Sequence, residues 1–402
     1  MRGKRYWVLG GYVAGAVVWA CSGSSSPEGF GNPGSSSGGS SGGSNAGGSS
    51  SGGANTGGSS GSSFSGDGGS LFSNDDGSAP SSGTGQDASV TVTTTIYANT
   101  DDSLYSVDPK TNAVTLVGAF SGGLTDASTN STITDVAVNA AGEVYVNSES
   151  AVYKATLPAT APGPVVLTLV STIAATSGTR FYALAFAPAG ALGATEMLVG
   201  GDGNGNLWSI DLANGGKTIE LGSFGDDPTT SGNILALSGD VVFYTDSSGK
   251  FQGLATIRSC KPAKSSTSTP TCSKTDDYLA GVDMTALATA FSSGTPAASL
   301  NNGIYGGSAT ALGAGIGHGE VFGLGAVEGN VIGFSRYQTA DAGVIAPALW
   351  AISTGEDGGA ASGSGTSIPG TFSFTNGWSG AGVTSKVTIV VPPPPPPPPA
   401  PK

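Results

Sequence analysis

The chain has 402 residues and a formal net charge of −13, with only 11% of its residues charged and 68 glycines. No lysine or arginine occurs between Arg5 and Lys110, so this stretch lacks the basic surface that a nucleic-acid backbone requires. We therefore expect no nucleic-acid partner. The glycine content and the shortage of charge predict tight turns and a surface rich in Ser and Thr.

The first twenty residues are predicted to be a signal peptide. Arg2, Lys4 and Arg5 precede an uncharged stretch, residues 6–20, that ends at Cys21. A basic start, a short apolar stretch and a small residue before the cut are the parts of a secretory signal. A helix of this length covers roughly 22 Å, less than the ~30 Å hydrocarbon core, so a permanent membrane span is disfavoured.

The residues at the end of this stretch, Val18, Trp19, Ala20 and Cys21, resemble a bacterial lipobox. The resemblance implies that Cys21 becomes the lipidated first residue of the mature chain and holds the protein in the cell envelope. By similarity to enterobacterial sorting rules, Ser22 implies the outer membrane. Ordinary cleavage after Ala20, which would release a secreted protein, is the alternative.

The two remaining cysteines are predicted to pair. Lipidation of Cys21 leaves Cys260 and Cys272, and exported chains form disulfides in an oxidising compartment. Such a bond would close the polar insertion 261–271 and contribute about 3 kcal/mol by the chain-entropy estimate. The insertion is expected to be either a rigid recognition loop or a pinned loop without a partner.

Both ends of the chain are of low complexity. Residues 21–91 are predicted to be a disordered tether, because 32 of the 42 residues in 22–63 are Gly or Ser and cannot bury enough apolar area to offset chain entropy. A flexible tether of this length spans about 45 Å. Residues 392–402 form a polyproline tail, which would serve as a spacer or bind an aromatic groove.

Residues 92–391 are predicted to fold as an all-β domain with an internal repeat. One strand pattern recurs five times, and the spacings between successive starts are 48, 55, 72 and 70 residues. Its copies are 104–108 (LYSVD), 152–156, 207–211 (LWSID), 279–283 and 349–353. Periods of this size, with four short strands each, indicate a β-propeller. Five blades are expected, and the longer late spacings leave six open.

The strands of individual blades can be assigned from alternation and turn residues. One blade is expected at 181–187, 197–201, 206–212 and 217–224, and the preceding one at 133–138, 144–147, 151–155 and 165–173. The first blade has only three strands, at 96–99, 104–108 and 114–120. We expect residues 378–384 to supply its inner strand, so that the two ends of the fold close the ring.

The pattern LYSVDPKTN resembles the blade repeats of bacterial extracytoplasmic propellers of the NHL-like and YVTN-type groups. The resemblance covers the repeat segments. It implies the architecture and leaves the activity open, because propellers host many functions.

Candidate catalytic residues are few. Asp135, Glu320 and Glu328 are predicted at or near inner strands, and His318 is the one histidine. An enzyme would use acids that converge at the propeller mouth, as glycoside hydrolases do with two carboxyl groups about 5–9.5 Å apart. The alternative is that these residues have structural roles.

A candidate metal site lies at Asp202, Asn204 and Asn206, whose spacing resembles the first half of a calcium loop. Leu207 and Ala213 stand where that loop needs Gly and Glu, and a β-hairpin turn explains the same residues. We therefore expect neither a metal nor a cofactor.

Together these features predict a membrane-tethered propeller outside the cytoplasm that acts as a binding or scaffold module for a protein or a cell-envelope glycan. The alternative function is a hydrolase or lyase acting on carbohydrate or lactone at the propeller mouth.

Overall fold

The computed structural model describes residues 94–122, 132–174, 179–246, 248–262, 270–272, 276–327, 330–337, 345–354, 362–370, 372–374 and 376–385. The predicted signal peptide, the lipobox at Cys21, the whole tether, Glu328 and the polyproline tail lie outside these residues. Their assignments remain predictions.

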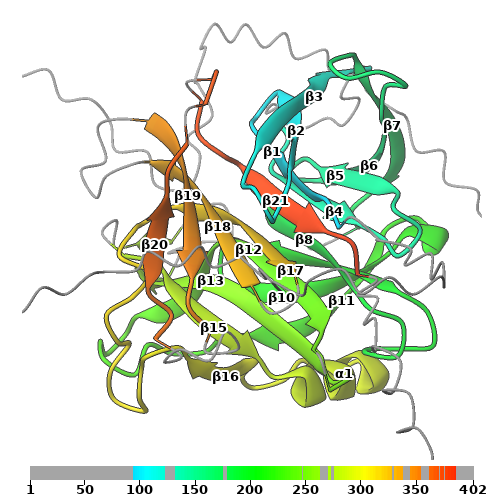
Figure 1. Cartoon of the computed structure of the whole chain (residues 1–402). Helices are drawn as coiled ribbons and strands as arrows, with labels where there is room; N and C mark the ends of the chain where they lie inside the picture. The colour runs from blue at the N-terminus through cyan, green and yellow to red at the C-terminus, as the bar shows by residue number, and fades with distance from the viewer. Residues whose placement is uncertain are drawn as a thin grey trace, which may run out of the picture.

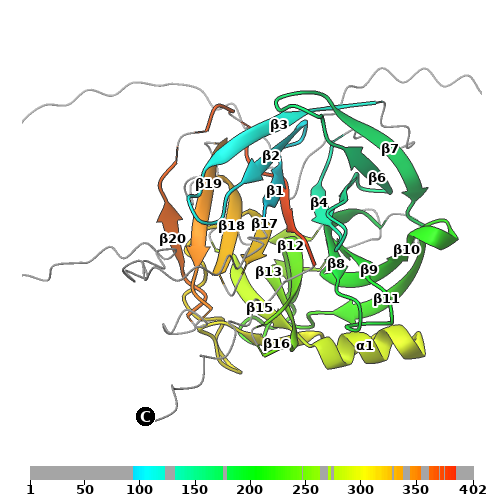
Figure 2. The same cartoon turned by 45° about the vertical axis from the view of Figure 1, so that its right-hand side comes forward.

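The described strands form five antiparallel blades around one axis (Figures 1 and 2), so the fold is a β-propeller. A short parallel pairing of their outer strands joins the first two blades into one eight-stranded sheet. Blade 1 contains β21 (Gly380–Val383), β1 (Ile96–Asn99), β2 (Ser103–Val107) and β3 (Val114–Ser121). Blade 2 contains β4 (Asp135–Val138), β5 (Val144–Asn147), β6 (Ala151–Thr156) and β7 (Val165–Thr172).

Blade 3 contains β8 (Phe181–Ala187), β9 (Met197–Asp202), β10 (Asn206–Asp211) and β11 (Lys217–Ser223), with a 3-10 turn at Leu212–Asn214. Blade 4 contains β12 (Ile234–Thr245), β13 (Phe251–Lys261), β15 (Tyr278–Val282) and β16 (Asn301–Ile304), and also carries β14 (Thr271–Cys272) and α1 (Met284–Ser293). Blade 5 contains β17 (Val321–Val327), β18 (Asn330–Tyr337), β19 (Ile345–Ile352) and β20 (Gly365–Ile368).

All five copies of the predicted repeat are third strands of blades, namely β2, β6, β10, β15 and β19. The blade number is therefore five, and the alternative of six is wrong. The late spacings are long because blade 4 inserts β14 between its second and third strands and α1 between its third and fourth. The helix was not predicted from the sequence.

The ring is closed by the two ends of the fold, as predicted. β21 pairs antiparallel with β1, from Ile96↔Val383 to Asn99↔Gly380. In Figure 1 the red C-terminal strand lies beside the blue-to-cyan strands of the first blade. The five inner strands contact one another in the cyclic order β21, β4, β8, β12, β17. Trp378, just before β21, is fully buried and packs edge-to-face on Tyr105 and Phe334.

The inner strands are buried along their length because each lies between two neighbouring blades and the axis. Every residue of β4, β17 and β21 is buried. Glycines permit the close approach of these strands. A Cβ atom on Gly239 would lie 2.3 Å from Cα of Phe322, and one on Gly382 would lie 2.2 Å from the carbonyl oxygen of Val136.

Candidate functional site

The axis of the ring is occupied by two carboxyl groups. Asp135 lies at the start of β4 and Asp240 in the middle of β12, and both side chains are fully buried. Their carboxyl groups hydrogen-bond to each other. Burial, followed by the nearby Asp240, raises the pKa of Asp135 well above its ordinary value, and burial likewise raises the pKa of Asp240.

Four of the five inner strands donate a backbone N–H to this pair. Asp135 accepts from Val136 of β4 at 2.8 Å and from Leu184 of β8 at 2.6 Å. Asp240 accepts from Val241 of β12 and Leu324 of β17, each at 2.6 Å, and the N–H of Ala381 in β21 acts to lower its pKa. We call Asp135 and Asp240 the axial pair. It joins the five blades at their centre.

The N-terminal face of the ring, the end at which the inner strands begin, is fastened by ion pairs. Arg336 of blade 5 binds both carboxylate oxygens of Asp101 in blade 1 at 3.0 and 3.2 Å, and Ser379 donates to the same carboxylate. Arg180 before β8 pairs with Glu149 of blade 2 at 3.4 Å. Both pairs cross seams between blades.

The third arginine of this face is buried. Arg258 forms an ion pair with Asp277 at 3.1 Å, and Ser238 hydrogen-bonds to both side chains. Asp277 also accepts the backbone N–H of Val321 in blade 5 at 2.7 Å. Burial raises the pKa of Asp277, and Arg258 opposes that rise. This cluster thus fastens blade 4 to blade 5.

The predicted catalytic candidates do not meet at the mouth. The ring of His318 stacks on Trp350 at 3.6 Å, and Trp350 belongs to β19, the third strand from the axis. With strands spaced about 4.8 Å apart, that strand lies roughly 10 Å outside the inner strand of its blade. Burial lowers the pKa of His318. Asp135, in contrast, lies on the axis.

Glu320 lies immediately before β17 and is buried. Its backbone has a φ of 61°, in the left-handed region that favours glycine. Its carbonyl oxygen accepts the N–H of Arg336 at 3.0 Å, which places the residue at the seam held by the pair of Arg336 with Asp101. Glu320 therefore forms the turn that leads into β17 on the N-terminal face.

The predicted calcium candidates form a turn closed by its own hydrogen bonds. The buried carboxylate of Asp202 accepts from the backbone N–H groups of Asn204 and Asn206 at 2.9 and 3.0 Å. It also accepts from the side chains of Asn206 and Trp208 at 2.9 and 3.0 Å. These four hydrogen bonds to Asp202 explain the spacing of Asp202, Asn204 and Asn206 as that of a hairpin turn. No group of three or more His, Cys, Asp or Glu side chains among the described residues is arranged to hold a metal ion.

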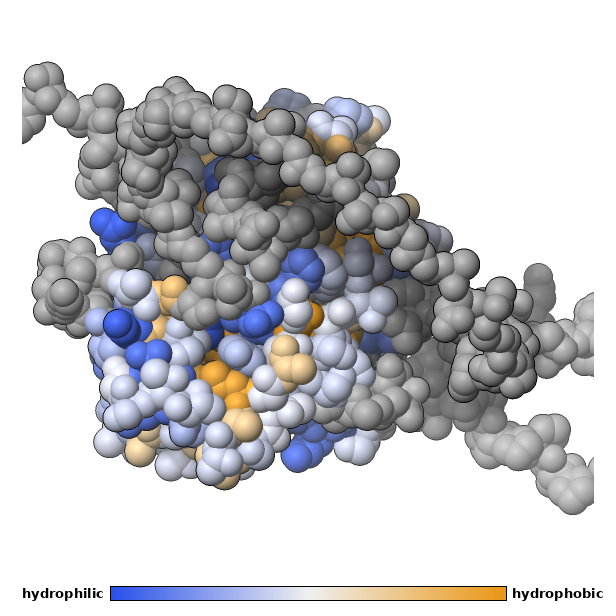
Figure 3. Space-filling model, turned by 90° about the vertical axis from the view of Figure 1, so that its left-hand side faces the viewer, coloured by the Kyte–Doolittle hydropathy of each residue, from blue (hydrophilic) through white to orange (hydrophobic). Residues whose placement is uncertain are grey.

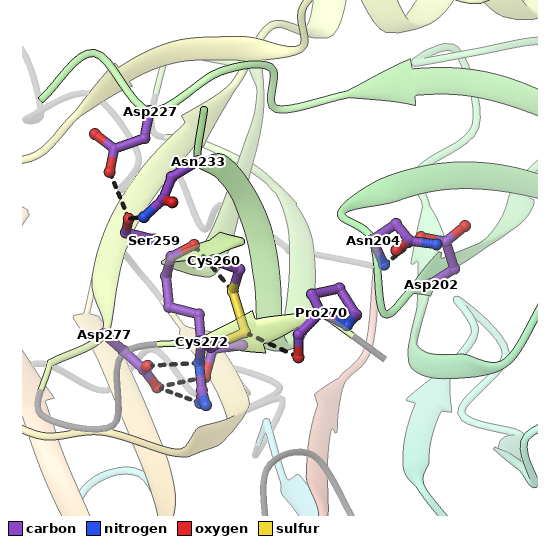
Figure 4. Close-up of a disulfide and its surroundings, with 11 residues drawn as sticks. Asp202, Asn204, Asp227, Asn233, Ser259, Cys260, Pro270, Cys272 and Asp277 are labelled. Carbon is purple, nitrogen blue, oxygen red and sulfur yellow. Dashed lines mark hydrogen bonds and ion pairs between the residues drawn. A yellow bond between two sulfur atoms is a disulfide. The ribbon is translucent and has the colours of Figure 1, made fainter. Parts of the chain in front are cut away.

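The disulfide between Cys260 and Cys272 is present and joins β13 to β14. Figure 4 shows Ser259, next to Cys260, between Asp227 and Asn233. Ser259 donates to Asp227 at 2.5 Å and accepts from Asn233 at 2.8 Å. Partial burial would raise the pKa of Asp227, but hydrogen bonds from Ser259 and Thr229 outweigh that effect and lower it. The disulfide strand therefore fixes the loop after β11.

A groove of about 680 Å³ lies beside that loop, at the seam between blades 3 and 4. One wall is the end of β11 with its following loop, and the other is β16 with the turns around it. Asp226 is the one charged lining residue, Ser299 and Asn301 contribute polar groups, and the partly exposed Ile304 contributes an apolar surface. The lining residues are 223–226, 228, 298–299, 301, 303–304 and 307–309.

Figure 3 shows one face of the molecule, where hydrophilic and near-neutral residues predominate and hydrophobic residues form small patches. Within the described part of the chain, no helix combines the length and apolar character needed to cross a membrane.

Sequence reasoning missed Asp240 and the groove. A lone Asp inside the apolar run of β12 was a usable signal, because a charged residue in a buried strand needs a partner. The groove gave no such signal, since its walls come from separate blades.

Comparisons with known proteins add little to this description. No family model and no curated protein matches the chain. Among solved structures, a protein of unknown function from Bacteroides caccae is similar at 11% identity and a TM-score of 0.33, over 72% of this chain and 98% of that one.

Two further solved structures are similar at the same low level. The extracellular domain of a putative one-component system from B. thetaiotaomicron has 11% identity and a TM-score of 0.29, over 65% of this chain and 31% of that one. The Dos1 propeller has 13% identity and a TM-score of 0.28, over 64% of this chain and 63% of that one. The strand order and the ring of inner strands, and not these similarities, establish the fold.

Proposed function

We propose that this protein is a non-catalytic binding module, presented outside the cytoplasm on its tether, and that it binds a polyhydroxylated glycan of the cell envelope in the groove between blades 3 and 4. The observation that carries the proposal is the lining of this groove. A carboxylate, an amide and several hydroxyls line the groove together with apolar groups, which suits the many hydroxyl groups and apolar ring faces of a sugar.

The state of the axial pair favours binding over hydrolysis. A glycoside hydrolase needs two carboxyl groups about 5–9.5 Å apart with the sugar between them. Asp135 and Asp240 instead hydrogen-bond directly to each other and accept backbone N–H groups. Their carboxyl oxygens thus serve the fold, and the groove contains only one carboxylate, Asp226.

The position of the groove also favours recognition. It lies on the outer rim, beside a loop that Ser259 and the adjacent disulfide hold in place. A fixed wall reduces the ordering that a ligand must impose, and this increases affinity.

The binding proposal is tested with the full-length chain on an array of bacterial envelope glycans, followed by calorimetric titration of the best ligand. Asp226→Asn should weaken binding at least tenfold through loss of a charged acceptor, and Ala298→Trp should abolish it by filling the groove. Asp276→Asn makes the same charge change outside the groove and should bind as the wild type does. Absence of any glycan ligand, or capture of a protein whose binding Ala298→Trp leaves unchanged, would refute the proposed site.

The predicted anchor has a separate test. Cys21→Ser removes the sulfur that a lipid would occupy, so the protein should move from the membrane fraction to the soluble fraction. Metabolic labelling with a fatty acid should mark the wild type and not the variant. Unchanged membrane partitioning of Cys21→Ser would refute lipid anchoring and leave the binding proposal intact.

A further inference from the structure

We propose that the axial pair holds one shared proton at neutral pH and that this proton is required to join the five blades, which makes the closed ring sensitive to pH. Asp135 would be the neutral acid, which donates its O–H, and Asp240 the carboxylate, which accepts it.

The hydrogen bond between the two carboxyl groups demands a proton. An ionised carboxylate is only an acceptor, whereas a protonated one has an O–H to donate. Two carboxylates in direct contact would place like charges in a fully buried site, which is strongly unfavourable. One proton turns this repulsion into a charge-assisted hydrogen bond.

The described inner strands hold no cation that could replace the proton. The inner strands β4, β8, β12, β17 and β21 contain no Lys, Arg or His within their described ranges. The titratable groups on or next to them are Tyr182, Tyr244 and Glu320. Farther out, Arg258 already pairs with Asp277.

The N–H groups around the pair favour Asp240 as the charged partner. Each carboxyl group accepts two backbone N–H groups at 2.6–2.8 Å, and the N–H of Ala381 acts on Asp240 alone. N–H groups stabilise the ionised form, so Asp240 is the better anion and Asp135 the better acid. The site is closely packed, since a Cβ on Gly380 would lie 2.0 Å from Oδ1 of Asp135.

The proton links the ring to pH with a definite sign. In the unfolded chain both residues ionise near pH 3.9. Above that pH the folded state binds one more proton than the unfolded state, until the pair itself ionises. Across this window each pH unit lowers the folding equilibrium constant up to tenfold. The stabilisation is therefore complete at acid pH and is lost as the pH rises.

Infrared spectroscopy of the full chain at about pH 7 tests the proton directly. The wild type should show the carbonyl band of a neutral carboxylic acid, and both Asp135→Asn and Asp240→Asn should lack it. Asp202→Asn, which removes a buried carboxylate in β9, the second strand of its blade, should retain it. No neutral-acid band in the wild type, or a band that persists in both axial variants, would overturn the proposal even if a variant folds poorly.

Denaturant unfolding provides the second measurement, from about pH 7 to pH 9, above the ordinary pKa of His near 6.5. The wild type should lose stability as the pH rises, and Asp135→Asn should flatten that slope because its amide supplies a permanent donor to Asp240. Asp240→Asn should be the less stable of the two variants, since it removes the better anion. Equal slopes in the wild type and Asp135→Asn would contradict the coupling of this proton to folding.

Discussion

Gly380 shows how strictly the axis limits the choice of residue. It faces Asp135, and a Cβ atom there would lie 2.0 Å from Oδ1 and 2.6 Å from Cα of that residue. The inner strands already contact one another around the ring, so neither strand can move without disturbing a third.

Gly380→Ala is therefore expected to lower the free energy of unfolding by about 1–3 kcal/mol, the usual penalty for overpacking. Gly281→Ala is the matched control, because the nearest atom to its added Cβ would be 3.6 Å away, an ordinary contact. Urea denaturation of both variants measures the difference. Equal stability of the two would mean that the axis is less closely packed than described.

At the scale of elements, much of the fold was predictable from the sequence. The third strand of each blade carries the repeated sequence pattern, as in β2, where Leu104, Tyr105 and Val107 are buried and Ser106 is partly exposed. That pattern and the turn residues around it identify the corresponding strand in every blade. The helix α1 was missed although Asp283 caps its N-terminus and Gly294 ends it, because ten residues give a weak helical period.

The axial pair could be predicted only in part, for a physical reason. Asp135 was recognised as an acid near an inner strand, but its partner lies 105 positions later in the chain. Their meeting depends on how far the ring turns between blade 2 and blade 4, which is set by the packing of every seam. Local sequence patterns contain no such information, and the same applies to the groove between blades 3 and 4.

The disulfide supports one element in particular, the short pairing of β14 with β13. Cys272→Ser is expected to lower the free energy of unfolding by about 3 kcal/mol through the entropy of the released loop. Cys272 is the better position to change, because it is partly exposed while Cys260 is fully buried and would lack a partner for a hydroxyl.

The measurement is denaturant unfolding without reductant, with Cys21→Ser as the background to prevent mispairing. Reductant should lower the stability of the parent to that of the variant and leave the variant unchanged. A parent that is insensitive to reductant would show that the bond does not support the fold.

At the scale of the whole molecule, two sets of acids give opposite pH dependences. Exposed turn acids prefer to be ionised in the folded state. Hydrogen bonds from Gln252 and Ser248 lower the pKa of Asp246 to about 2, and a backbone hydrogen bond from Lys110 lowers the pKa of Asp108. The contribution of these acids to the free energy of unfolding is complete above about pH 3.9. It is lost as the pH falls through their lowered pKa.

The axial pair acts in the reverse direction, since its raised pKa makes its contribution complete below about pH 3.9 and progressively lost above it. His318, whose pKa is lowered by burial, favours the folded state less as the pH falls below about 6.5. The stability of the full chain should therefore be greatest between about pH 4 and pH 6.5, on the acid side of neutrality. Urea midpoints measured across this range test the expectation. In Asp135→Asn the decline on the alkaline side should be smaller, whereas a wild-type midpoint that keeps rising to pH 8 would show that the turn acids, and not the axial pair, dominate.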